Sequence, residues 1–117
     1  IYIGVIWGFW HAPIILQGHN YPGYPIPGVL LMVLWCVLLS PIFTLVREKS
    51  GSVIAASIAH GALNGTAGIS IVYISGGHTL LNGIMGISGC IVLVLVNTGI
   101  WFYLKRETGQ GILVKNG

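Results

Sequence analysis

Three polar side chains with catalytic chemistry lie inside long apolar stretches of this sequence. His11 is in the first stretch, and His60 and Asn64 are in a later one. A spacing of four residues places His60 and Asn64 on the same face of a helix. Histidine can act as a base or a metal ligand, and an asparagine amide can donate to a developing oxyanion. We therefore take His11, His60 and Asn64 as candidate catalytic residues.

The histidines differ in their surroundings. A single histidine in an apolar helix is often a hydrogen-bonded packing residue, but polar groups are costly in lipid. Two histidines on separate apolar segments, one with an Asn four residues later, favour a functional site over packing. His19 and His78 lie in two loops. They are solvated there, and we expect them to be neutral to function.

The composition indicates which solvent surrounds these residues. Of 117 residues, 55% are hydrophobic and only 6% are charged, whereas soluble domains carry about 25% charged residues. Such a chain suits a bilayer. The net charge of +3 lies at predicted helix ends, so we do not expect nucleic-acid binding. Cys36 and Cys90 lie in apolar stretches, which favours buried thiols over a disulfide.

Clusters of charge divide the chain into apolar segments. The seven charged residues all lie within 47–49, 105–107 and at 115. The segments between them and the loops are 1–17, 29–46, 53–74 and 83–104. The longer ones span roughly 33 Å as helices, and the hydrocarbon core is about 30 Å thick. We predict an all-α polytopic transmembrane bundle of about four segments, with a membrane domain over 1–104 and a short, frayed tail over 105–117.

The basic residues predict the orientation of the segments. Residues 47–49 and 105–106 lie two crossings apart and therefore on the same side. The loops at 18–28 and 75–82 contain no Lys or Arg. Three prolines and three glycines exclude a regular helix over 18–28. The positive-inside rule then places the C-terminus in the cytoplasm.

Small residues predict where helices pack closely. Gly61 and Gly65 form a GxxxG pattern, which allows close backbone approach in lipid. The face that carries His60 is small and polar, with Ser57, Ala56, Ala67 and Gly68 near it. We expect tight helix packing here, and such packing is compatible with an intramembrane site.

Two motifs in this order resemble those of the CPBP family of intramembrane proteases. The segment from Trp7 through His11 to Pro13 resembles the family's aromatic–x–x–x–His motif, with Trp7 where the family often has Phe. The turn at 49–52, followed by His60 and Asn64, resembles a later motif in which a "TGS"-like turn leads into a His–x–x–x–Asn helix. The resemblance covers roughly residues 1–68. The family includes type II CAAX prenyl proteases, Abi proteins and lysostaphin-resistance-A-like proteins.

The resemblance implies an intramembrane endopeptidase of a prokaryotic plasma membrane, acting on a peptide or on a prenylated or lipidated protein. A glutamate and His11 would activate water, and His60 and Asn64 would stabilise the oxyanion. Members are often described as metalloproteases, so His11 and His60 could instead bind zinc or another divalent metal. The family's Glu-Glu-x-x-x-Arg motif is absent, and the only acids are Glu48 and Glu107. We interpret the chain as a C-terminal part that begins after that motif, and expect it to be inactive alone.

Three other functions would also use polar residues within a membrane protein. The first is a catalytically silent relative acting in bacteriocin self-immunity or as a scaffold, which lacks the glutamate motif. The second is a haem protein with two histidine ligands, in which Asn64 and Trp7 have no role. The third is a transporter, for which the chain shows no repeated pair of broken helices.

A shared site makes a demand on the first helix. His60 lies near the cytoplasmic end of its segment and His11 near the opposite loop. For the two to meet, the first helix must end early or kink near Pro13, with residues 14–28 dipping back into the membrane.

Overall fold

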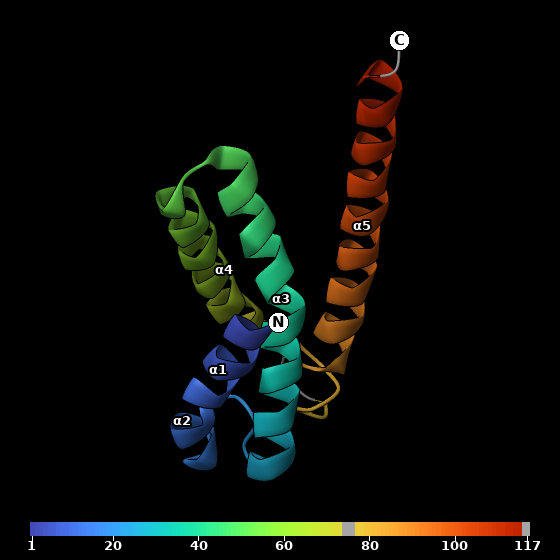
Figure 1. Ribbon diagram of the computed structural model, residues 1–117. Helices are drawn as coiled ribbons and strands as arrows, with labels where there is room; N and C mark the ends of the chain where they lie inside the picture. Colours follow the sequence, from blue (N-terminus) through green and yellow to red (C-terminus); the bar gives the residue numbers. More distant parts are fainter. Residues whose placement is uncertain (74–76, 116–117) are drawn as a thin grey trace.

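The computed structural model describes the backbone of residues 1–73 and 77–115, and the side chains of 1–67 and 77–108. Within these ranges every regular element is a helix and there is no strand, as predicted. Figure 1 shows the helices in chain order: α1 (Tyr2–Trp10), α2 (Ala12–Leu16), α3 (Pro25–Ser50), α4 (Val53–Tyr73) and α5 (Ile87–Lys115).

Helix α3 is the centre of the fold. Helices α1, α2, α4 and α5 all pack against it. The buried core lies around the first half of α3 and comprises Ile15, Tyr21, Met32, Trp35, Cys36, Leu39 and Cys90. Figure 1 shows α4 folding back beside α3, while α5 forms a long helix on another side of α3. Both cysteines are buried free thiols, as expected.

Two helices in the described part of the chain are long and apolar enough to cross a membrane. They are Pro25–Ser50 and Ile87–Thr108. The prediction of about four segments is therefore supported for two. The first predicted segment is a shorter apolar stretch, Tyr2–Leu16. Helix α4 begins at Val53 as predicted, and the predicted end of that segment at Ile74 lies outside the described residues.

The first segment breaks where a shared site requires it to break. Helix α1 ends at Trp10, and His11 is both the C-cap of α1 and the N-cap of α2. Pro13 lies in the first turn of α2. Because proline has no N–H and clashes with the preceding turn, α1 cannot continue through it.

Close helix packing occurs at a glycine pair for which the sequence analysis did not predict it. Gly4 and Gly8 of α1 are buried against α3. A Cβ at Gly4 would lie 2.6 Å from Val37 Cα, and one at Gly8 would lie 2.5 Å from Val33 Cα. The prediction of tight packing at Gly61 and Gly65 is wrong, because no described neighbour lies within 4 Å of a Cβ at either position. The same spacing occurs on both helices, and only the assembled fold determines which one meets a neighbour.

Other element ends differ from the predicted ones for local reasons. Helix α3 begins at Pro25, inside the predicted loop, because prolines in a first turn lose no helical hydrogen bond. Helix α5 begins at Ile87, because Gly83 has a φ of 87°, outside the helical region. It continues to Lys115 through the predicted frayed tail, where Tyr103 donates to Glu107 one turn later at 2.7 Å.

Polar side chains donate to backbone carbonyls within α3 and also join α3 to its neighbours. Pro41 cannot donate to the Val37 carbonyl, and the Ser40 hydroxyl donates to it at 3.0 Å. Asn97 of α5 donates to the Leu38 carbonyl of α3 at 2.7 Å. Such a bond between helices stabilises packing in lipid. The Trp35 indole donates to the Ile84 carbonyl at 2.9 Å, which attaches the loop before α5 to α3.

Candidate functional site

His11 lies at the break between α1 and α2 and is partly buried. Its Nδ1 lies 2.8 Å from the Trp7 carbonyl oxygen. A carbonyl only accepts, so Nδ1 carries the hydrogen and donates it. The neutral ring then has its free lone pair on Nε2. A histidine oriented in this way can accept a proton or bind a metal through Nε2.

His60 and Asn64 form a hydrogen-bonded pair on α4. Asn64 Nδ2 lies 3.1 Å from His60 Nε2. An amide nitrogen donates, so His60 Nε2 accepts and its hydrogen is on Nδ1. The amide has a second N–H that this bond does not use. The predicted common face of these two residues is confirmed by their contact.

Trp7 lies against both histidines. Its ring centroid is 5.1 Å from that of His60, in an edge-on contact, and 6.1 Å from that of His11. Phe43 of α3 lies 5.5 Å from His60 and 6.0 Å from Trp7. Residues from α1, α3 and α4 thus meet at one place. In the described part of the chain, no hydrogen bond joins His11 directly to His60 or Asn64.

Phe43 was not predicted from the sequence. It lies in an apolar stretch of α3 without a motif around it, so only its contacts with Trp7 and His60 reveal it. Trp7, the aromatic residue of the first motif, contacts the His11 ring and also supplies the carbonyl that orients His11.

The His60–Asn64 pair faces an open side of α4. His60 is partly buried, whereas Ser57, Gly61, Asn64 and Gly65 are exposed. Because Gly61 and Gly65 have no side chains, no bulky group covers the surface of α4 beside the pair. A peptide backbone could approach Asn64 there without meeting a bulky side chain. The open face explains why this polar pair has no further hydrogen-bond partner among the described residues.

The described residues do not form a metal site by themselves. In 1–67 and 77–108, no three His, Cys, Asp or Glu side chains lie together in a way that could hold a metal ion. A catalytic zinc site has about three protein ligands. The Nε2 lone pair of His60 also already accepts from Asn64. His11 and His60 therefore supply at most two of the ligands that such a site needs.

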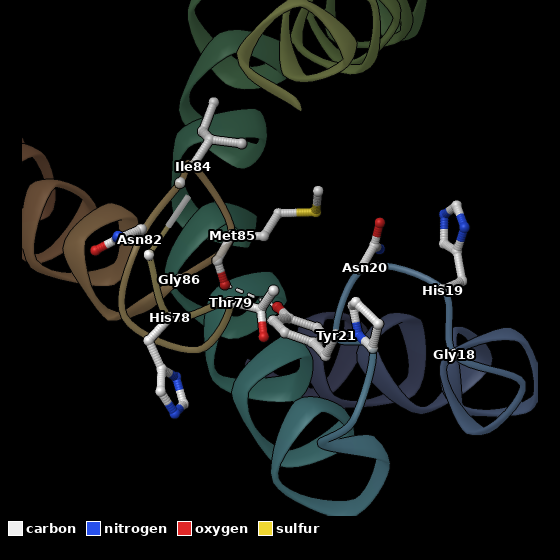
Figure 2. A pocket seen from close by; sticks show the side chains of 13 residues that line it. Gly18, His19, Asn20, Tyr21, His78, Thr79, Asn82, Ile84, Met85 and Gly86 are labelled. Carbon is white, nitrogen blue, oxygen red and sulfur yellow. Dashed lines mark hydrogen bonds between the residues drawn. The ribbon is translucent and has the colours of Figure 1, made fainter. Parts of the chain in front are cut away.

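His19 and His78 lie apart from this cluster. Both line a cavity of about 410 Å³ between the loop before α3 and the loop before α5. Figure 2 shows their rings on opposite sides, directed away from each other. The His78 ring lies 4.6 Å from the Tyr24 ring. The two histidines do not converge on a common point.

Tyr21 holds the two loops of this cavity together. Its hydroxyl donates to the Met85 carbonyl at 2.7 Å, the dashed line of Figure 2. Burial raises the pKa of the Tyr21 hydroxyl above its ordinary value. The hydroxyl therefore remains protonated and keeps its role as a donor.

A match with a known protein family covers the part of the chain that contains this cluster. The family model described as type II CAAX prenyl endopeptidase Rce1-like matches residues 1–66. This range contains Trp7, His11, Phe43, His60 and Asn64. No curated protein and no solved structure matches the chain.

Proposed function

Because the chain belongs to the Rce1-like family of type II CAAX prenyl endopeptidases, we propose that it carries part of the active site of an intramembrane endopeptidase. In this proposal His11, His60 and Asn64 are the catalytic side chains. The observation that carries it is the meeting of His11 and His60 at the Trp7 ring. The two family-like motifs come from separate helices, and this contact brings them into one place.

His11 and Asn64 have roles that follow from their hydrogen bonds. His11 has a free Nε2, because its Nδ1–H is held by the Trp7 carbonyl. It accepts a hydrogen bond from the attacking water and so orients that water for attack. Asn64 donates one N–H to His60. Its other N–H donates to the oxygen of the scissile carbonyl, where negative charge develops.

The proposal includes an acidic residue outside residues 1–117 that assists His11. The two acids of the chain do not suit this role. Glu107 binds Lys49 and accepts from Tyr103 near the end of α5, and Glu48 lies in the last turn of α3. A carboxylate beside His11 would hold the water and take up its proton.

The substrate in this proposal is a peptide or a prenylated or lipidated protein. It approaches along the exposed face of α4, where Gly61 and Gly65 leave space beside Asn64. Close backbone approach would place a carbonyl within reach of the free Asn64 N–H. Bulky side chains at these glycines would block this approach.

One observation favours a second function. Within the described residues no acid joins His11 and His60. A relative without any such acid would bind peptides without cleaving them, as a scaffold or an immunity protein would. Activity measurements on the full-length protein distinguish the two functions.

The test uses the full-length gene product in lipid nanodiscs with a fluorogenic prenylated peptide. We expect His11→Ala, His60→Ala and Asn64→Ala each to lower kcat by about 100-fold or more. His19→Ala is the matched control, because this histidine lies in a loop away from Trp7, and it should retain full activity. Full activity in the three site variants would exclude the proposed roles, and peptide binding without any cleavage by the wild type would support the silent relative.

A further inference from the structure

Helix α5 carries two cations without an acidic partner near the end of its apolar stretch. Glu107, the nearest acid in sequence, binds Lys49 of α3 and accepts from Tyr103 at 2.7 Å. Lys105 lies over the Trp101 ring, with Nζ 5.1 Å from its centroid. Arg106 has no ion pair among the described residues. The positive charge at Lys105 and Arg106 is therefore not neutralised within the described protein.

Lys105 and Arg106 lie on a face of α5 that differs from the face of Glu107. Helical spacing places Phe102, Lys105 and Arg106 on one face. The opposite face carries Ile100 and Leu104, which line a cavity together with Glu48. Glu107 binds Lys49 of α3 and so points toward α3. The face of Phe102, Lys105 and Arg106 thus points away from both acids of the chain.

These three residues line an open groove of about 650 Å³. All three are exposed. The groove combines the aromatic ring of Phe102 with two positively charged side chains. Arginine and lysine are the usual protein partners of phosphate oxygens. A ligand that fits has an apolar part beside Phe102 and an anionic part beside Arg106.

The position of the groove indicates the source of such a ligand. It lies at the end of the apolar stretch Ile87–Thr108, which is largely exposed and so has its sides open to lipid. Exposed aromatic residues, Trp101, Phe102 and Tyr103, lie at this level of α5. Aromatic and basic residues gather where hydrocarbon meets lipid headgroups.

We propose that the groove of Phe102, Lys105 and Arg106 binds the phosphate of an anionic phospholipid. Arg106 and Lys105 hold the phosphate oxygens, and Phe102 packs against the start of the acyl chains. A zwitterionic lipid binds less well, because its own cation is repelled by both side chains. This site is independent of the proposed peptidase activity.

The test measures binding of dioleoyl phosphatidylglycerol and dioleoyl phosphatidylcholine to the full chain by native mass spectrometry. We expect phosphatidylglycerol to bind more tightly. Arg106→Gln should weaken its binding by roughly 5-fold, and the Lys105→Gln/Arg106→Gln double variant by roughly 30-fold. The matched control is Arg47→Gln, which removes an exposed cation of α3 outside the groove and should change binding less than 2-fold.

Further arms separate the alternatives. The variant Lys105→Arg/Arg106→Lys keeps both charges and should keep the lipid preference, which distinguishes lost binding from lost folding. Equal losses in Arg47→Gln and Arg106→Gln would overturn the proposal in favour of diffuse charge. Equal binding of both lipids would overturn it as well. Displacement of the lipid by an equal concentration of glycerol 3-phosphate would show a free-anion site in place of a lipid site.

Discussion

Trp7 of α1 and His60 of α4 meet edge to face, with their ring centroids 5.1 Å apart. The Trp7 carbonyl also accepts from His11. One residue therefore orients one histidine through its backbone and contacts the other through its ring. Its ring and its carbonyl therefore have separate roles. Substitutions of the side chain test the role of the ring alone, because they leave the carbonyl in place.

Trp7→Ala removes the ring that lies against His60 and should lower kcat of the full-length protein by about 10-fold to 100-fold. Trp7→Phe should keep most of the activity, because a smaller ring still contacts His60. Phe9→Ala is the control, because Phe9 is an exposed aromatic residue of the same helix. Steady-state kinetics give kcat and KM separately. A change in KM alone would show that Trp7 binds substrate and does not position His60.

Asn64→Asp keeps the shape of the side chain but removes its N–H donors. We expect kcat to fall by about 100-fold or more, because a carboxylate repels a developing oxyanion. Asn82→Asp is the control, because Asn82 is an exposed asparagine in the loop before α5. Activity near the wild-type level in Asn64→Asp would mean that Asn64 does not contact the oxyanion.

Gly8→Ala should destabilise the fold by about 1–3 kcal/mol, because the added Cβ meets the backbone of Val33, which cannot rotate away. Gly99→Ala places a Cβ in open space on α5. It should be neutral or stabilise by up to about 1 kcal/mol through helix propensity. Unfolding in mixed detergent micelles, followed by circular dichroism, measures both. Equal stability of the two variants would show that α1 does not pack on α3 through Gly8.

Asn97→Leu removes the bond from α5 to the Leu38 carbonyl. We expect a loss of about 0.5–2 kcal/mol in the free energy of unfolding, since bonds between helices in membranes are modest. Thr98→Val is the matched control, because the Thr98 hydroxyl donates only within its own helix. The same detergent unfolding measures the difference. A larger loss in the control would contradict the role of Asn97 in joining α3 and α5.

Metal removal should leave the fold of residues 1–117 unchanged. Two histidines, one of them already bonded to Asn64, do not make a structural metal site. Circular dichroism before and after a chelator should agree, and dialysed protein should hold less than one zinc ion per chain by elemental analysis. In the full-length protein, stoichiometric zinc that is lost in both His11→Ala and His60→Ala would identify the two as ligands.

Several features could be read from the sequence alone because they depend on local spacing and composition. The low charge predicts helices in lipid, and α3 and α5 are long and apolar enough to span it. The spacing of His60 and Asn64 predicts a common face, and the two side chains are in contact. The motifs around His11 and His60 indicate the CAAX-protease family, which the family match confirms.

Other features were decided only by the tertiary structure, because they depend on which helix faces meet. Gly4 and Gly61 both begin GxxxG patterns, yet among the described residues only Gly4 lies against another helix. Phe43 has no local signal and enters the site because α3 lies at the centre of the fold. Residue spacing determines which side chains share a face. The position of each face depends on long-range contacts such as that of Trp7 with His60, which no local pattern specifies.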